Sequence, residues 1–333
     1  MTLHALAPGK VNLCLFLGGT RADGLHELVS VIEPLSLADE LTLEPLPGGA
    51  GVAAAAGVGD AGCAAGEDEV VCAGVEGPNL ARAALAAWRA ASGWEGPPVR
   101  LTIAKRVPVA AGMGGGSGDA AAALRLAAHA AGRPGDPLIA TLAPRLGADV
   151  PSQVAPGPVL VGGAGEDVRP LAALPPHGVL VLPSPHALST PDVFREADRL
   201  GLPRPVAELA ERRAAVEAAL AGGAAGGGAG SGAAAGSPLP ANLLVNDLEP
   251  AARSLCPWID DALAAARAAG ADHALVSGSG PTVVGLFHGA DGVAAAEAAA
   301  GELRGRFPDA SAARPVDAAF AAIRGVWNHE ARA

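Results

Sequence analysis

The sequence predicts an α+β protein with two domains. Strand and helix patterns are mixed in both halves of the chain, and 333 residues, half of them apolar, are enough for two moderate cores. We predict one domain at residues 1–165 and a second at residues 166–333. The stretch 221–238 contains only Gly, Ala, Ser and Pro, has little to bury, and is expected to form a flexible insert in the second domain.

The elements of the first half follow from residue spacing. Apolar residues alternate from Val11 to Leu17, which is the period of a strand, and Lys10 and Asn12 share the opposite face. An amphipathic pattern begins after Asn79, a good N-cap residue. The other expectations are strands at 41–43 and 99–107, helices at 79–91 and 119–131, and an irregular Gly- and Ala-rich excursion at 48–66.

The second half shows the same mixture of periods. Two short apolar runs flank a tight glycine turn, as expected for neighbouring strands, and longer periodic stretches indicate helices. The predicted helices cover 242–255, 258–269 and 292–307, and the predicted strands cover 273–277 and 282–287.

Charge and cysteine usage limit the possible partners. The net charge of −11 gives no overall attraction for nucleic acid or an anionic membrane, so an anionic substrate needs a local basic site. No apolar run is long enough to span a bilayer, and the short run 11–19 lacks the cleavage pattern of a signal peptide. The four cysteines form no cluster with metal-ligand spacing. We therefore expect a cytoplasmic protein with free thiols and no protein-bound metal site.

The strongest motif is the glycine-rich loop from Pro108 to Ser117, which follows a predicted strand and leads into a predicted helix. Such a loop presents backbone N–H groups and the positive end of a helix to a phosphate. It matches neither the Walker A pattern nor the dinucleotide-binding fingerprint. The alternative is a flexible loop in a glycine-rich protein.

Three further segments have two interpretations each. Lys10 and Asn12 on one strand face suit a hydroxyl or phosphate, although a solvated lysine beside a turn is the commoner case. Asp149 lies at a predicted helix-to-strand junction, where it either caps a turn or accepts the proton of an attacking alcohol. The turn at 277–282 is either an ordinary hairpin turn or a second wall over bound phosphates.

Taken in order, these segments resemble the motifs of the galactokinase, homoserine kinase, mevalonate kinase and phosphomevalonate kinase superfamily. Within it, the sequence is similar to the 4-diphosphocytidyl-2-C-methyl-D-erythritol kinase family from about Leu6 to the last predicted strand. The similarity is carried by APGKVNLCLFLGGTRADGLHEL, KRVPVAAGMGGGSGDAAAAL, LGADVPSQV, NDLEP and SGSGPT. It implies an N-terminal ribosomal-protein-S5-like domain and a C-terminal ferredoxin-like domain, with the site in the cleft between them.

The resemblance also implies roles for individual residues. Lys10 and Asp149 match the catalytic pair of the family. The positions expected to contact ATP are Asn79, Lys105, Pro108, Gly112, Gly114, Gly115, Gly116, Ser117 and Gly118. The positions expected to contact the acceptor are Asn12, His26, Thr190, Phe194, Gly278 and Ser279, with Phe194 stacking on a cytosine. Leu25 stands where many members have an aromatic residue, and Asp119 is expected either to cap the helix or to help position Mg²⁺.

The activity implied is ATP- and Mg²⁺-dependent phosphorylation of the 2-hydroxyl of 4-diphosphocytidyl-2-C-methyl-D-erythritol, in the methylerythritol phosphate route to isoprenoid precursors, by a monomer or homodimer. One alternative is another kinase of the superfamily, such as a homoserine or mevalonate kinase, against which His26 and Phe194 argue. The other is a catalytically silent nucleotide-binding regulatory protein, against which the presence of both Lys10 and Asp149 argues. A Rossmann-type dehydrogenase is excluded because the required strand, glycine fingerprint and acidic residue do not line up.

Overall fold

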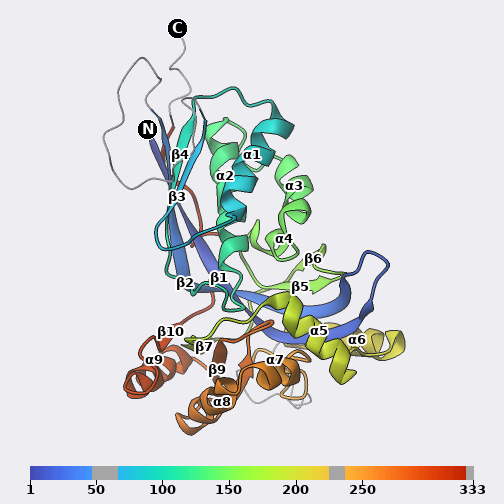
Figure 1. Cartoon of the computed structure of the whole chain (residues 1–333). Coiled ribbons are helices and arrows are strands. Elements are labelled where there is room, and N and C mark those ends of the chain that lie inside the picture. The colour runs from blue at the N-terminus through green and yellow to red at the C-terminus, as the bar shows by residue number, and fades with distance from the viewer. Residues whose placement is uncertain (47–66, 225–236, 328–333) are drawn as a thin grey trace.

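The computed structural model describes residues 1–46, 67–224 and 237–327, and these residues contain two β-sheets with helices packed against them (Figure 1). The larger sheet has the order β11-β1-β2-β4-β3, with β5 also paired to β2 and β6 paired to β5. Its strands are β1 (Thr2–Thr20), β2 (His26–Pro45), β3 (Glu69–Cys72), β4 (Val99–Ala104), β5 (Val159–Gly162), β6 (Asp167–Pro170) and β11 (Arg324–Val326).

The smaller sheet has the order β10-β7-β9-β8. Its strands are β7 (His177–Leu182), β8 (His273–Val276), β9 (Val283–His288) and β10 (Ser311–Ala313). All of its pairings are antiparallel. The two mixed layers confirm the predicted α+β class, while the division of the chain at residue 165 stays a prediction.

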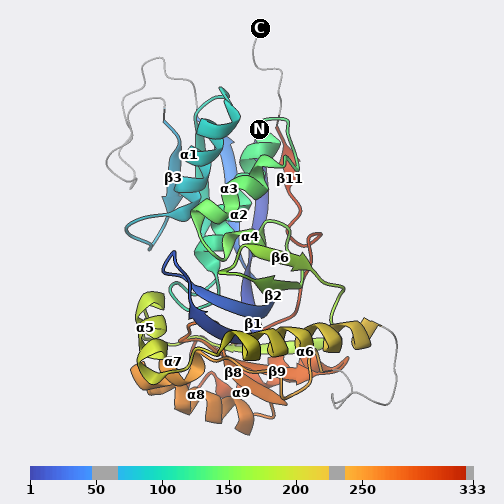
Figure 2. The same cartoon turned by 90° about the vertical axis from the view of Figure 1, so that its right-hand side faces the viewer.

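The helices form two groups (Figures 1 and 2). The group beside the larger sheet is α1 (Leu80–Ser92), α2 (Gly115–Ala130), α3 (Leu138–Leu146) and α4 (Val150–Gln153). The other group is α5 (Thr190–Leu200), α6 (Val206–Ala224), α7 (Glu249–Leu255), α8 (Trp258–Ala268) and α9 (Gly292–Leu303). In the part of the chain that the structure describes, no helix has the length and apolar character needed to cross a membrane.

The long strands β1 and β2 connect the two halves of the molecule. They pair antiparallel along most of their length, with register shifts between Pro8 and Lys10 and between Asn12 and Cys14. Such irregularities bend a strand, and Figure 2 shows β1 and β2 curving over the smaller sheet. The bends lie where β1 carries Lys10 and Asn12, so the strand irregularity and the candidate site coincide.

Three large apolar clusters among the described residues hold these layers together. One packs α1, α2 and α3 against the larger sheet, with Trp88 fully buried. A second joins the smaller sheet to α5, α7, α8 and α9. The third contains Leu13 and Phe16 of β1, Val181 of β7 and Val216 of α6, so it bridges the two sheets below the bend. This shared cluster of buried side chains fixes β1, and with it the larger sheet, against the smaller sheet.

Several predicted boundaries need correction. The predicted helix at 242–255 is wrong before Glu249, because the backbone of residues 245–247 bonds instead to Leu15 in β1. Strand β4 ends at Ala104 rather than at 107, and α2 begins at Gly115 rather than at 119. The excursion at 48–66 and residues 225–236 of the predicted insert lie outside the described residues. Residues 221–224, the start of that predicted insert, belong to α6.

Candidate active site

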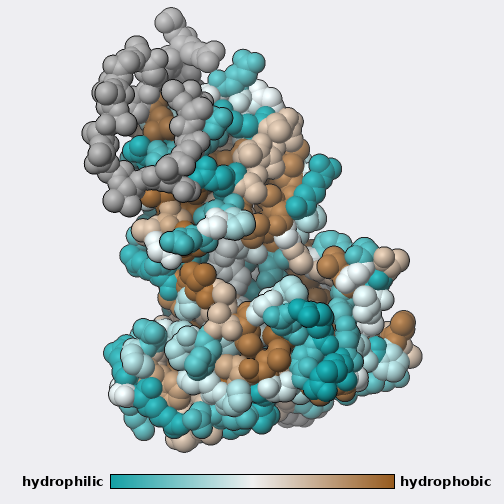
Figure 3. Space-filling model, in the orientation of Figure 1, coloured by the Kyte–Doolittle hydropathy of each residue, from teal (hydrophilic) through white to brown (hydrophobic). Residues whose placement is uncertain are grey.

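A cavity of about 990 Å³ lies between the larger sheet and the smaller one. Its walls come from β1, β2, the glycine-rich loop, the start of α5 and the turn after β8. Figure 3 shows hydrophobic residues gathered at the waist of this face, where the surface is hollowed between the upper helices and the lower layer. This volume lies at the upper end of the range that is typical of small-molecule binding sites.

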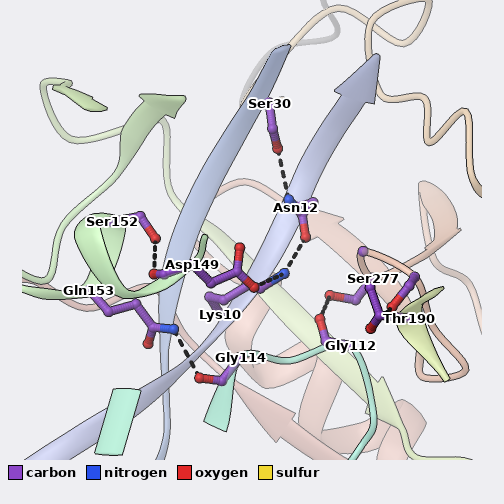
Figure 4. Close-up of polar contacts among 12 residues, drawn as sticks. Lys10, Asn12, Ser30, Gly112, Gly114, Asp149, Ser152, Gln153, Thr190 and Ser277 are labelled. Atoms are coloured by element: carbon purple, nitrogen blue, oxygen red, sulfur yellow. Dashed lines mark hydrogen bonds and ion pairs between the residues drawn. The ribbon is translucent and has the colours of Figure 1, made fainter. Parts of the chain in front are cut away.

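Lys10, Asn12 and Asp149 line this cavity, and their side chains point toward one another (Figure 4). The Lys10 Nζ donates a 2.6 Å hydrogen bond to Asn12 Oδ1 and lies 3.6 Å from Asp149 Oδ2. Asn12 Nδ2 in turn donates to Ser30 Oγ at 2.8 Å. The Lys10 side chain is 5% exposed and that of Asp149 is 42% exposed, so a buried ammonium faces an accessible carboxylate.

Asp149 lies between α3 and α4, so the predicted helix-to-strand junction is wrong, and its carboxylate makes no capping hydrogen bond to α4. The backbone carbonyl of Asp149 accepts a hydrogen bond from Ser152 Oγ at 2.8 Å, which fixes the turn. Gln153, in the last position of α4, donates from Nε2 to the carbonyl of Gly114 at 2.9 Å. The turn therefore keeps the carboxylate free for the cavity while tying α4 to the glycine-rich loop.

The loop itself requires glycine at particular positions. Gly112 and Gly114 have φ angles of 73° and 65°, in the left-handed region that side chains rarely adopt. A Cβ on Gly114 would lie 2.9 Å from Lys10 Cγ, and a Cβ on Gly112 would collide with the carbonyl of Ser277. The loop is also joined to β1, since Lys10 N donates to the carbonyl of Met113 at 2.8 Å. These contacts bring the start of α2 beside Lys10, as a phosphate cradle requires.

Lys105 lies beneath the same loop in a different setting. Its Nζ contacts Asp39 Oδ2 at 2.5 Å and Asp119 Oδ2 at 2.9 Å. Burial raises the pKa of Asp119 to about 7; the ammonium of Lys105 opposes this rise and the charge of Asp39 adds to it. Burial alone would lower the pKa of Lys105, but the two carboxylates raise it above its ordinary value. Asp119 therefore neither caps α2 nor stands free, because it is paired with Lys105.

The far end of the cavity carries the residues expected to bind a base. The rings of His26 and Phe194 lie 5.1 Å apart at a 44° tilt. His26 Nε2 is 2.8 Å from Asp198 Oδ1 and 3.2 Å from Thr20 Oγ1. Leu25, 52% exposed, also lines the cavity. This end presents one benzene ring, one imidazole and an aliphatic side chain.

The turn after β8 closes the cavity from the smaller sheet. Asn246 Nδ2 donates to the carbonyls of Val276 and Gly278, at 2.8 and 2.7 Å. A Cβ on Gly278 would lie 3.1 Å from both Lys10 Nζ and Asn12 Oδ1. The hydroxyl groups of Thr190 and Ser279 are 2.9 Å apart, which links this turn to the start of α5. The turn therefore stands directly against the Lys10 centre.

The cavity wall contains every residue proposed from the sequence except Gly118. A Cβ on Gly118 would meet Gln153 Oε1 at 2.9 Å and the carbonyl of Pro8 at 3.1 Å, so this position serves close packing of α2. Asn79 lines the cavity and also caps α1, accepting from Ala81 N at 2.9 Å as the sequence predicted.

Sequence reasoning missed the residues that form hydrogen bonds or ion pairs with the groups lining the cavity and so support them. These residues are Ser30, Asp39, Gln153, Asp198 and Asn246. Each is a polar residue at some distance in sequence from the group that it contacts, and no local spacing indicates such a pairing. The NDLEP segment contained Asn246, but nothing in the segment indicated that its amide supports the turn after β8.

Comparisons with known proteins agree with this geometry. Residues 79–158 match the family model "GHMP kinases N terminal domain", and residues 238–305 match "GHMP kinases C terminal". A 4-diphosphocytidyl-2-C-methyl-D-erythritol kinase from Streptomyces coelicolor is 40% identical over 294 residues, covering 86% of this chain and 88% of the relative. The enzyme of the same name from Paracoccus denitrificans is 36% identical, covering 92% and 95%.

Solved structures give the same result. A crystal structure of 4-(cytidine 5'-diphospho)-2C-methyl-D-erythritol kinase superposes with a TM-score of 0.68 at 33% identity, covering 94% of this chain and 98% of that one. A homoserine kinase from Cytophaga hutchinsonii has a TM-score of 0.64 at 16% identity, covering 97% of each chain, and this second likeness concerns the fold alone.

Proposed function

The chain belongs to the 4-diphosphocytidyl-2-C-methyl-D-erythritol kinase family, and from this premise we propose that Lys10 and Asp149 carry the transfer of the γ-phosphoryl group of ATP to the 2-hydroxyl of the cytidyl sugar alcohol. The protein is an ATP-dependent small-molecule kinase of the isoprenoid pathway. The observation that carries the residue assignment is a buried ammonium and an accessible carboxylate, 3.6 Å apart, beside a glycine loop that opens a helix.

In the proposed mechanism the acceptor hydroxyl enters between Asp149 and the start of α2. Its oxygen attacks the γ-phosphorus, the bond from that phosphorus to the β–γ bridging oxygen breaks, and ADP leaves with the bond electrons. The hydroxyl proton passes to the Asp149 carboxylate. Lys10 stabilises the negative charge on the attacking oxygen and the transferring group, while Asn12 holds the ammonium in place through its 2.6 Å hydrogen bond.

The nucleotide phosphates are proposed to lie on the backbone N–H groups of Gly114 to Ser117. Among the described residues, no group of three or more His, Cys, Asp or Glu side chains is arranged to hold a metal ion. Mg²⁺ commonly binds through substrate phosphates with few protein ligands, and the hydroxyl of Ser117, which lines the cavity, is the group that we expect to contact it. When bound, Mg²⁺ supplies neutralisation of phosphate charge.

The acceptor's cytosine is proposed to stack on Phe194, with His26 at its edge. Leu25 then covers the other side with an aliphatic group, so stacking is one-sided. Asn12 and the turn at Gly278 and Ser279 lie at the sugar-alcohol end, next to Lys10. The proposal includes a cytoplasmic location and a monomeric or homodimeric state, of which the second is tested by sedimentation velocity.

The experiment for the function is ADP release by the purified protein with Mg-ATP and a panel of acceptors. The panel contains the diphosphocytidyl sugar alcohol, mevalonate, homoserine and galactose, and ³¹P NMR identifies the position of the new phosphate. Turnover with the cytidyl acceptor alone, phosphorylated at the 2-hydroxyl, is the expected result. Turnover only with another acceptor would refute the cytosine pocket, and ATP binding without turnover of any acceptor would refute the assigned kinase activity.

A further inference from the structure

The two hydrogen-bonding partners of the His26 ring contact the same ring nitrogen, Nε2. Asp198 Oδ1 is 2.8 Å from His26 Nε2, and Thr20 Oγ1 is 3.2 Å from the same atom. Phe194 approaches the ring at 5.1 Å between centroids. Among the described residues, no partner forms a hydrogen bond with His26 Nδ1, and His26 is one of the residues that line the cavity.

A carboxylate accepts hydrogen bonds and has no hydrogen to donate. A neutral imidazole that bonds to a carboxylate through Nε2 therefore carries its hydrogen on Nε2, which leaves Nδ1 as a lone-pair acceptor. The Thr20 hydroxyl accepts a share of the same N–H without changing this result. The partner of one ring nitrogen thus determines the chemistry of the other.

The element that carries Asp198 also carries the stacking ring. Phe194 and Asp198 are four residues apart on α5, so they share one face of that helix. α5 lies against the turn between β1 and β2 that precedes His26 (Figures 1 and 2). One helix therefore supplies both a surface for the face of a base and the group that orients the residue at its edge.

We propose that Asp198 is a positioning residue that selects a pyrimidine with an amino group over one with an oxo group, by holding His26 as the tautomer whose Nδ1 is a hydrogen-bond acceptor. The exocyclic amine of a cytosine donates to such a nitrogen. Uracil presents a carbonyl oxygen at that position, which places two acceptors opposite each other. This inference rests on the proposed function, because it assumes that the base of the acceptor lies at this end of the cavity.

The composition of this end makes the edge contact decisive. Among the described residues that line the cavity, Phe194 and His26 are the only ones with aromatic rings. A phenyl ring stacks on cytosine and uracil alike, and Leu25 contributes apolar area without distinguishing them. A site built to hydrogen-bond a substrate group discriminates far more strongly than an apolar surface does. Discrimination between the two bases is therefore assigned to the edge of His26.

The test compares kcat/KM for the cytidine acceptor with kcat/KM for its uridine counterpart, in the wild-type protein and in Asp198→Asn. An asparagine amide can accept from Nε2–H or donate to a bare Nε2, so either tautomer of His26 becomes possible. The ratio of the two kcat/KM values is expected to fall about tenfold in Asp198→Asn, mainly through KM of the cytidine acceptor. Glu196→Gln is the matched control, because Glu196 is on the same helix and pairs with Arg199 and Ser254 outside the cavity.

A second measurement does not depend on any variant. Long-range ¹H–¹⁵N NMR of the wild-type protein above pH 7.5 is expected to show the His26 hydrogen on Nε2 and a bare Nδ1. An unchanged ratio in a folded Asp198→Asn, or a hydrogen on Nδ1 in the wild type, would overturn the inference. Failure of the proposed function is distinguishable, because it shows as absent turnover of the cytidine acceptor by the wild-type protein itself.

Discussion

Lys10 and Lys105 are the two lysines of the chain, and they lie beside neighbouring glycines of the glycine-rich loop, Lys10 at Gly114 and Lys105 at Gly115. Lys10 has an amide 2.6 Å away and one accessible carboxylate at 3.6 Å. Lys105 has two carboxylates at 2.5 and 2.9 Å, and Asp39, the closer one, is fully buried. The two ammonium groups beside the glycine-rich loop are thus paired loosely with carboxylate in one case and tightly in the other.

This difference suits Lys10 to stabilising charge on a ligand and Lys105 to stabilising the fold. A lysine with a single distant counter-ion retains most of its capacity to stabilise incoming negative charge. A lysine that already neutralises two buried carboxylates has little such capacity, and its removal would leave uncompensated charge in the interior. Asp39 also accepts hydrogen bonds from Arg106 N and Val107 N, at 2.6 and 2.8 Å, so the Lys105 cluster fixes the entry of the loop.

The largest expected effect is on turnover in Lys10→Met. Losing the ammonium removes charge stabilisation at the transferring group, so kcat should fall on the order of 10²- to 10³-fold while KM for ATP changes little. Steady-state kinetics and thermal unfolding measure the two consequences. Lys105→Met is the comparison variant, and it should lose more stability than Lys10→Met because two buried carboxylates lose their partner. A kcat for Lys10→Met within a few-fold of wild type would contradict the division between the two lysines.

A smaller effect is expected from Asp39→Asn. The substitution keeps the shape but places an amide against the Lys105 ammonium, so the free energy of unfolding should fall by about 3 kcal/mol. KM for ATP should rise more than kcat falls, because the entry of the loop is loosened. Urea unfolding and kinetics provide the readouts, with Asp167→Asn as control, since Asp167 is 54% exposed in its pair with Arg213. An equal decrease in the free energy of unfolding in both variants would contradict a special contribution of the Lys105 cluster to stability.

The smallest expected effect is a pH dependence of stability from Asp119. Its pKa is raised from 3.8 to about 7, first by burial. The folded protein therefore keeps a proton that the unfolded chain releases, and this contribution to stability is full below pH 3.8 and is lost as pH rises through about 7. The stability of Asp119→Asn relative to that of the wild type should therefore increase as pH rises from 5 to 8, as measured by urea midpoints. A constant difference across that range would contradict the raised pKa.

The sequence predicted the residues that line the cavity better than it predicted the residues that support them. Lys10, Asn12 and the glycine-rich loop carry local signals, because strand alternation and helix-opening glycines are visible within a few residues. Asp39 and Lys105 are 66 residues apart, and Asp198 is 172 residues from His26. Such pairings depend on how β2, β4 and α5 are arranged in space, which local periodicity does not encode.

The fold shows the same limit. The mixed class, the Asn79 cap and the strands around the glycine turn followed from local patterns. The long bent pair β1–β2 and the true start of α7 did not. The segment before Glu249 has helical spacing, yet its backbone hydrogen-bonds to Leu15, so tertiary pairing overrides the local preference.

The proposed joint action of Lys10 and Asp149 is tested most directly by a double-mutant cycle on kcat with the cytidyl acceptor. The four proteins are the wild type, Lys10→Met, Asp149→Asn and the variant that carries both substitutions. Groups that act as one unit lose their effect together, so the double variant should be no more than about threefold slower than the slower single variant. Rate losses that multiply in the double variant would show that the two residues act independently and would contradict the mechanism.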